Sequence, residues 1–163
     1  MGGPRKEIIQ TAFDKALIQV EHPSVYLAGT MATDWREIVA PILAGGGFRI
    51  LRPEDNDQTS PLAYVPGDVK MCRECDVWFG YWSPGVKSRG VYIELGIAME
   101  NHRPVWAAWA EEPDRPVYQW VATAAYRLFV GPNSAVEAAK NLAAWLQQVK
   151  AANGAMPAGG SNA

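Results

Sequence analysis

The sequence has few features that would cross-link the chain or attach it to a membrane. Cys72 and Cys75 are the only cysteines among 163 residues, too few for a disulfide framework. No apolar run approaches the roughly 20 residues that span a bilayer, and the beginning, MGGPRKEIIQ, lacks the apolar core of a signal peptide. A net charge of −2 gives no electrostatic basis for binding long nucleic acid. We therefore expect a cytoplasmic protein without a membrane or nucleic-acid partner.

Composition and length predict one globular domain. Hydrophobic residues make up 48% of the chain and charged residues 20%, values typical of a soluble fold. We assign residues 1–150 to a single domain without internal repeats. The last residues, 151–163, are small and Gly-rich, so we expect a disordered tail.

Hydrophobic periodicity predicts strands that alternate with helices. Such alternation is typical of a parallel sheet with helices on both faces. The expected strands are Ser24–Ala28, Phe48–Leu51, Val77–Trp82, Pro104–Trp109 and Arg127–Val130. The expected helices are Arg5–Glu21, one from the N-cap Thr33 to the glycines 45–47, Asp68–Cys75, Gly90–Asn101, Val117–Ala125, and one from Ser134 to about Lys150.

Three loops are the expected places for a ligand. In parallel sheets ligands bind beyond the carboxyl ends of the strands. The loops that follow the first three strands are Gly29–Asp34, Pro53–Gly67 and Ser83–Arg89.

The segment SRGVYIELG, Ser88–Gly96, combines a helix start with a carboxylate. Backbone N–H groups at Ser88, Arg89 and Gly90 face outward at the positive end of a helix. Glu94 follows one turn later among apolar neighbours. Spacing alone leaves two alternatives: a solvated carboxylate on the polar face of the helix, or a carboxylate held in a site.

Three segments together resemble the nucleoside 2-deoxyribosyltransferase-like superfamily, which includes nucleoside 5′-monophosphate N-glycosidases. They are VYLAGT (25–30), Asp68 ahead of the strand DVWFGYW, and RGVYIELGIAMENHRPVW (89–106). The resemblance implies a Rossmann-like, flavodoxin-like sheet of about five strands, to which the N-terminal helix is an addition. It also implies that Glu94 is the nucleophile that attacks C1′ of the sugar, that Asp68 contacts the base or acts as the general acid, and that Tyr26 hydrogen-bonds the nucleophile.

The chemistry of an N-glycosidic bond suits two neighbouring carboxyl groups. A carboxylate stabilises and traps the positive charge that develops at C1′. The departing base needs a proton, and crowding two carboxyls raises the pKa of one of them so that it can supply that proton. The scheme needs no cofactor and no metal, and it resembles retaining glycoside hydrolysis.

One departure from the transferase pattern bears on the substrate. Ser88 stands where the deoxyribosyltransferases carry an aspartate and where the 5′-monophosphate glycosidases carry a phosphate-binding serine. Lys87 and Arg89 flank it, which favours a nucleotide, although a solvated basic loop is the alternative. Gly29, Thr30, Trp35 and Gly90 complete the expected binding residues.

Other patterns support weaker hypotheses. The pair Cys72 and Cys75 has a redox or zinc spacing, but it precedes a strand and no histidine is near it, so buried structural cysteines are expected. Glu54, Asp55 and Asp57 have the chemistry of a hard-cation site, with a solvated loop as the favoured alternative and a base-contacting or lid role between the two. Trp35 and Trp82 follow strands, where an aromatic ring either stacks on a base or packs in the core.

Three functions stay open at this stage. The leading one is an enzyme that cleaves the N-glycosidic bond of a 2′-deoxynucleoside or its 5′-monophosphate, by hydrolysis or base exchange. The alternatives are an inactive nucleotide-binding module and an N-glycosidase that acts on a ribonucleotide or modified nucleotide. Because family members often complete their site with a neighbouring subunit, we expect a homodimer or higher oligomer.

Overall fold

A five-stranded parallel sheet forms the centre of the protein in the computed structural model, which describes residues 14–17, 19–85, 89–111 and 115–154. The strands lie in the order β2-β1-β3-β4-β5, and every neighbouring pair is parallel. Their bounds are β1 Ser24–Gly29, β2 Arg49–Leu51, β3 Val77–Trp82, β4 Val105–Trp109 and β5 Arg127–Val130. This is the flavodoxin-like order, and it confirms the predicted fold.

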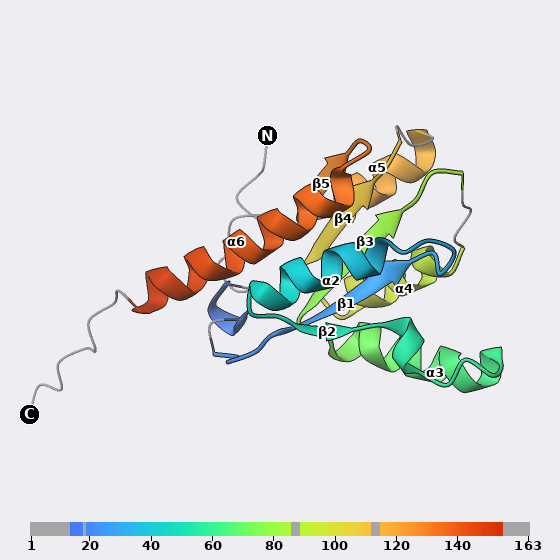
Figure 1. Cartoon of the computed structure of the whole chain (residues 1–163), viewed down its shortest axis with the longest axis horizontal. Coiled ribbons are helices and arrows are strands. Elements are labelled where there is room, and N and C mark those ends of the chain that lie inside the picture. Colours follow the sequence, from blue (N-terminus) through green and yellow to red (C-terminus); the bar gives the residue numbers. More distant parts are fainter. Residues whose placement is uncertain (1–13, 18, 86–88, 112–114, 155–163) are drawn as a thin grey trace, which may run out of the picture.

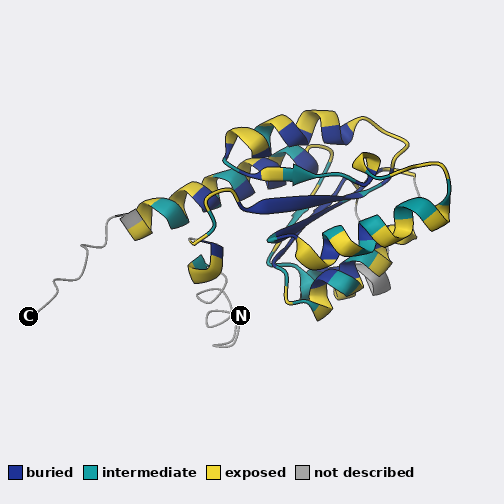
Figure 2. Ribbon diagram, turned by 90° about the horizontal axis from the view of Figure 1, so that it is seen from below, coloured by how far each residue is buried: buried dark blue, intermediate teal, exposed yellow. Residues whose placement is uncertain are grey.

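Helices cover both faces of the sheet (Figure 1). They are α2 Trp35–Gly45, α3 Pro61–Glu74, α4 Gly90–Glu100, α5 Arg115–Ala124 and α6 Ser134–Gly154, with a short 3₁₀ turn, η1, at Pro53–Asp55. α2 and α6 pack together on one face, and α3 and α4 pack together on the other. The three inner strands β1, β3 and β4 are almost wholly buried (Figure 2), which explains their continuous hydrophobic runs.

The loop after the second strand is shorter than the sequence predicts. The prolines of Pro53–Gly67 predict a loop, but α3 already begins at Pro61, seven residues before the expected start at Asp68. Proline is favoured at the first position of a helix, where its missing N–H is not needed, and Ser60 precedes it as the N-cap residue. The correction places Asp68 in the middle of a helix.

The ends of two other helices also differ from expectation. The N-cap residue of α2 is Asp34 and not Thr33, and this helix continues through Pro41 to Gly45. α6 extends to Gly154, so residues 151–154 of the expected disordered tail are helical, and 155–163 lie outside the described residues. Of the expected N-terminal helix, residues 14–17 are helical and 5–13 and 18 lie outside the described part.

The two central strands send their chains to opposite faces of the sheet. β1 leads into α2, whereas β3 leads to α4 on the other face, so the carboxyl ends of β1 and β3 form the switch point of the topology. Ligands of open parallel sheets bind at this point. Gly29 ends β1 with a φ of +153°, and a Cβ there would lie 2.7 Å from the backbone oxygen of Tyr81. Only glycine lets the two strand ends approach this closely.

Candidate active site

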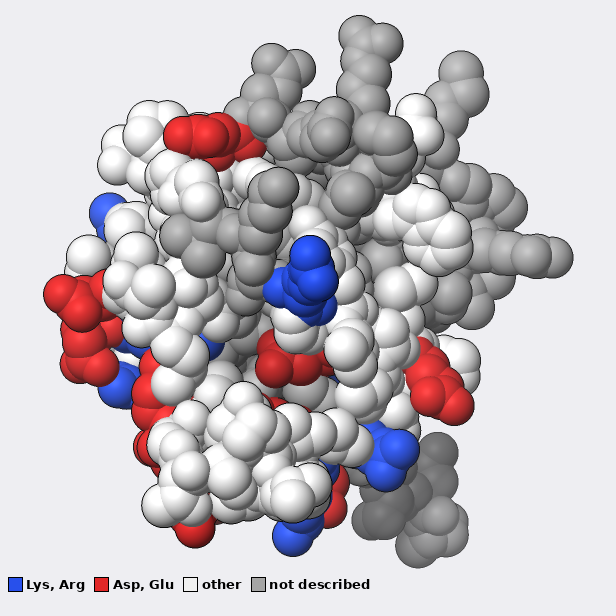
Figure 3. Space-filling model, turned by 90° about the vertical axis from the view of Figure 1, so that its right-hand side faces the viewer, with Lys and Arg blue, Asp and Glu red and all other residues white. Residues whose placement is uncertain are grey.

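The candidate site lies at the carboxyl end of the sheet, on the face covered by α3 and α4. Tyr26 comes from β1, Asp68 from α3 and Glu94 from α4, which are three elements separated in the sequence. Figure 3 looks onto this end of the molecule, where acidic side chains are visible in a hollow near the middle, close to basic side chains. The resemblance predicts these three residues as the catalytic group.

Glu94 is held by the side chain of Tyr26. The Tyr26 hydroxyl donates a hydrogen bond to Glu94 Oε1 at 3.2 Å. Tyr26 is fully buried in β1, so its hydroxyl has a fixed location beneath α4, the helix that carries Glu94. Glu94 itself is partly exposed. Of the two alternatives left open by the sequence, this contact favours a carboxylate held in a site.

The environment of Glu94 brings the pKa of its carboxyl group close to neutral pH. Burial is the largest cause and raises the pKa of Glu94 from 4.5 to about 7. The Tyr26 hydrogen bond lowers this pKa, the Asp68 charge raises it, and the Arg36 guanidinium lowers it. A carboxyl group with a pKa near 7 is ionised often enough at neutral pH to act as a nucleophile, and strong shifts of this kind are typical of active sites.

Asp68 is buried and has a partner that the sequence did not reveal. The amide Nδ2 of Asn56 donates to Asp68 Oδ1 at 2.7 Å. Burial raises the pKa of Asp68, while the Asn56 bond and the Arg36 charge lower it and the Glu54 charge raises it. Because Asn56 occupies Oδ1, the other oxygen is the natural place for a proton that Asp68 would transfer.

Cys72 lies one turn after Asp68 on the same face of α3, and it is fully buried. Burial raises the pKa of its thiol, and the charge of Glu94 raises it further, whereas a contact with the Tyr26 hydroxyl lowers it. Cys75 is also buried, and burial raises its pKa to about 12. Both are free thiols, as expected for structural cysteines, and Cys72 forms part of the wall behind Tyr26.

The other predicted binding residues fall into two groups. Arg89 and Gly90 are exposed at the start of α4, while Ser88 and Lys87 lie outside the described residues. Thr30 is buried, and its hydroxyl accepts a hydrogen bond from the Ala32 amide at 3.0 Å, which shapes the loop after β1.

The two tryptophans proposed as stacking surfaces are packed inside the protein. Trp35 is 5% exposed, stacks on Phe79 and donates from Nε1 to the Thr30 carbonyl at 3.2 Å. Trp82 is 4% exposed and stacks on Trp109 at a centroid distance of 4.5 Å. For both residues the structure favours packing over stacking on a base.

The acidic loop residues have protein partners. Glu54 Oε1 accepts from Arg36 at 2.8 Å, and Asp55 Oδ2 accepts from the backbone amide of Arg52 at 3.2 Å. Within the described ranges no three metal-ligating side chains are grouped closely enough to hold a metal ion. None of the described helices is long and apolar enough to cross a membrane.

Sequence reasoning missed Arg36 and Asn56. Arg36 is 2% exposed and stands on the buried stripe of α2 with Val39, Ala40 and Leu43. A charged residue on an otherwise apolar helix stripe is the signal that was available in the sequence. Asn56 carries no such signal, because its role depends on how the loop after β2 folds back onto α3.

Solved structures with the same fold include enzymes that act on nucleosides and nucleotides. The CMP N-glycosidase BcmB of Clostridium botulinum matches with a TM-score of 0.57 at 21% identity, over 73% of this chain and 97% of that one. A 2-deoxyribosyltransferase of Bacillus psychrosaccharolyticus matches with a TM-score of 0.56 at 16% identity, over 68% of this chain and 88% of that one. A 2-desoxiribosyltransferase of Leishmania mexicana matches with a TM-score of 0.50 at 22% identity, over 61% and 71%.

At these identities the likeness establishes a shared fold. No family model and no curated protein sequence matches the chain.

Proposed function

We propose that the protein is an enzyme of the nucleoside 2-deoxyribosyltransferase-like superfamily that cleaves the N-glycosidic bond of a 2′-deoxynucleoside or its 5′-monophosphate. The observation that carries the proposal is the hydrogen bond from Tyr26 to Glu94 at the switch point of the sheet, on the face that also holds Asp68. A binding module needs no nucleophile, and a carboxyl with a pKa of about 7 held by a buried tyrosine is suited to be one.

In the proposed reaction Glu94 and Asp68 divide the work. One oxygen of Glu94 accepts a hydrogen bond from the Tyr26 hydroxyl, and the other oxygen attacks C1′ of the sugar. As the C1′–N bond breaks, its electron pair goes to the base nitrogen and Asp68 donates a proton to the base. The product is a free base and a glycosyl ester on Glu94.

The second half of the reaction regenerates the enzyme. Asp68, now ionised, removes a proton from water, and the resulting oxygen attacks C1′ and releases Glu94. A second base that takes the place of water would give a new nucleoside, which is base exchange. No cofactor is required in either case, and a cytoplasmic location stays a prediction.

A second candidate substrate is a ribonucleotide, favoured by the fold shared with an enzyme named CMP N-glycosidase. Against it, in the proposed reaction the Tyr26 hydroxyl bonded to Glu94 would crowd a 2′-hydroxyl on the attacked sugar. The inactive nucleotide-binding module is the third candidate.

The deciding experiment is a substrate panel. The purified protein is incubated with the four 2′-deoxynucleosides, their 5′-monophosphates and CMP, each with and without a second free base, and the products are separated by chromatography. We expect the enzyme to release the base from at least one deoxy substrate. If it is a transferase, adding a second free base should also yield a new nucleoside; if it is a hydrolase, it should not. Release from CMP alone would favour the ribonucleotide candidate. Binding without release from any substrate would contradict the proposal and favour the binding module.

A further inference from the structure

Arg36 is a buried charge in the described part of the molecule that the proposed reaction does not use. Its side chain is 3% exposed, and all three guanidinium nitrogens have acceptors within the protein. A side chain enclosed in this way does not touch a substrate. An unpaired charge in such a place would be very costly, so the groups around Arg36 must repay its loss of hydration.

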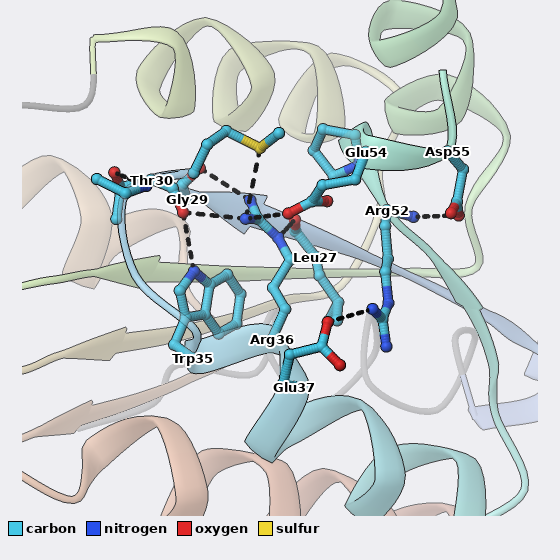
Figure 4. A network of polar contacts seen from close by, with 12 residues as sticks. Leu27, Gly29, Thr30, Trp35, Arg36, Glu37, Arg52, Glu54 and Asp55 are labelled. Carbon is cyan, nitrogen blue, oxygen red and sulfur yellow. Dashed lines mark hydrogen bonds and ion pairs between the residues drawn. The ribbon is translucent and has the colours of Figure 1, made fainter. Parts of the chain in front are cut away.

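The Arg36 guanidinium joins the end of β1 to η1, the turn that follows β2 (Figure 4). On the β1 side it donates from Nε to the Leu27 carbonyl at 3.0 Å, from one terminal nitrogen to the Gly29 carbonyl at 2.8 Å, and from the other to the Thr30 carbonyl at 3.0 Å. On the β2 side it forms an ion pair with Glu54 of η1 at 2.8 Å.

The two ends of this clamp lead directly to the site residues. Leu27 follows Tyr26 in β1, so the bond to its carbonyl holds the strand at the point where Tyr26 supports Glu94. The turn η1, held by Glu54, is followed at once by Asn56, which donates to Asp68 Oδ1. A Cβ at residue 67 would collide with the Asn56 amide, so Gly67 leaves the room that this contact needs.

We infer that Arg36 is a positioning residue that sets the relative placement of Glu94 and Asp68, by fastening the end of β1 to the turn that carries Asn56. The inference rests on the proposed function for its effect on turnover, but the geometry of the clamp stands independently of it. Misplacement of a reacting group by about 1 Å costs on the order of 10²-fold in rate, so a clamp of this kind is kinetically important.

The charge of Arg36 adds an electrostatic effect in the same direction. The guanidinium lowers the pKa of both Glu94 and Asp68, opposing the burial that raises them. Burial lowers the pKa of Arg36 itself, and the carboxylate of Glu54 raises it. Loss of the guanidinium would therefore leave both site carboxyls more protonated at neutral pH.

Arg52 offers a matched control. It donates to Glu37 of α2 at 2.7 Å, so it also joins this helix to the end of β2, but on the solvent side, with side chains 28% and 69% exposed. Arg52→Met removes the same charge, and an exposed ion pair of this type contributes little to stability.

The experiment compares Arg36→Met, Arg36→Lys, Glu54→Gln and Arg52→Met with the parent protein. One measurement is kcat and KM on the best substrate of the panel. The other is the titration of the ¹³C-labelled Glu94 carboxyl by NMR, assigned with Glu94→Gln, which needs no turnover. If the parent cleaves nothing, the proposed function fails, and the Glu94 titration then reports only the charge of Arg36. In that case the NMR resonance of the Asn56 side-chain amide tests the clamp, because it should shift in Arg36→Met and Glu54→Gln but not in Arg52→Met.

For Arg36→Met we expect kcat to fall on the order of 10²-fold with little change in KM, and Glu94 to titrate at higher pH than in the parent. Arg36→Lys should restore the Glu94 titration but not kcat, because an ammonium group cannot serve three carbonyls and a carboxylate in the geometry of a guanidinium fork. Glu54→Gln keeps the arginine but weakens its ion pair, and it should lower kcat by about tenfold. If Arg36→Met does not fold, the kcat of Glu54→Gln tests the inference in its place.

Arg52→Met should leave both kcat and the Glu94 titration as in the parent. The inference is overturned if Arg36→Met and Glu54→Gln change kcat and the Glu94 titration no more than Arg52→Met does. It is equally overturned if Arg36→Lys restores kcat in full, because the charge alone would then account for the effect.

Discussion

Glu94 is a carboxyl group whose ionisation is controlled by burial and by three neighbouring side chains. Its pKa of about 7 predicts that base release increases as pH rises through about 7, because the nucleophile must be ionised. Initial rates over a range of pH test this, and a rate that is flat from pH 5 to 8 would contradict it.

The same shift predicts a pH dependence of stability. The pKa of Glu94 is raised from 4.5 to about 7 in the folded protein, so between these values the folded state holds more protons than the unfolded state. The free energy of unfolding therefore decreases as pH rises through this window. Glu94→Gln should remove this part of the decrease, as measured by urea unfolding at pH 5 and pH 8. Glu100→Gln, at an exposed position of the same helix, should keep it.

Asp68 is predicted to act on the leaving group. Asp68→Asn keeps the size of the side chain but cannot donate the proton, so the rate should fall on the order of 10²-fold. Substrates whose bases leave without protonation should lose much less. Equal losses for good and poor leaving groups would instead assign Asp68 to positioning the base. Asp57→Asn, at an exposed position of the same connection, is the control and should have no effect.

The sequence predicts three candidate site residues but not the side chains that hold them. Tyr26, Asp68 and Glu94 followed from the resemblance, and the contact of Tyr26 with Glu94 agrees with it. The partners Arg36 and Asn56 were missed because their contacts join residues 18 and 12 positions apart through the fold of a loop. Local patterns in a sequence do not encode such loop geometry.

At the scale of elements, the connection from β3 to α4 is predicted to select between nucleoside and nucleotide. It places Arg89 and Gly90 at the positive end of α4. Ser88, which lies outside the described residues, is the position where a carboxylate would repel a 5′-phosphate. Ser88→Asp should lower kcat/KM for the monophosphate by about a hundredfold and spare the nucleoside, since a charge-assisted contact contributes about 1.5–3 kcal/mol.

The ratio of the two specificity constants in parent and variant is the measurement. Asn153→Asp adds the same charge at the far end of α6 and should leave the ratio unchanged. A parent protein that already prefers the plain nucleoside would contradict the nucleotide hypothesis.

Strands were easier to predict than helix ends. β3 and β5 have the predicted bounds: the apolar run of β3 lies between Asp76 and Ser83, and β5 ends at Val130, just ahead of Gly131. The expected start of α3 lies seven residues too late because prolines occur both in loops and in the first turn of a helix, and only the fold distinguishes the two. That error concealed the full length of the helix that carries Asp68.

At the scale of the whole molecule, α4 exposes apolar side chains on the side away from the sheet. Ile93 is 68% exposed, Met99 41% and Tyr92 39%, although a helix that is apolar all round is normally buried. α3, which packs beside it, adds Leu62 at 90% exposure. Exposed apolar patches of this kind often mark protein interfaces, which supports the expectation of a homo-oligomer.

We therefore predict that Ile93→Glu shifts the protein toward the monomer in sedimentation velocity experiments, because a charge at an apolar interface opposes association. Ile38→Glu is the matched control. Ile38 is 58% exposed on α2, which covers the opposite face of the sheet, and the change should leave the distribution as in the parent. A parent protein that sediments as a monomer at micromolar concentration would contradict this prediction.

The most direct test of the central claim is base release by Glu94→Ala compared with the parent and with Glu100→Ala, which changes an exposed glutamate of the same helix. Free base is measured by chromatography on the best substrate of the panel, and circular dichroism checks that each variant is folded. If Glu94 is the nucleophile, its removal should lower the rate on the order of 10³-fold or more, while Glu100→Ala retains the parent rate. Release by Glu94→Ala within a few-fold of the parent would contradict the account.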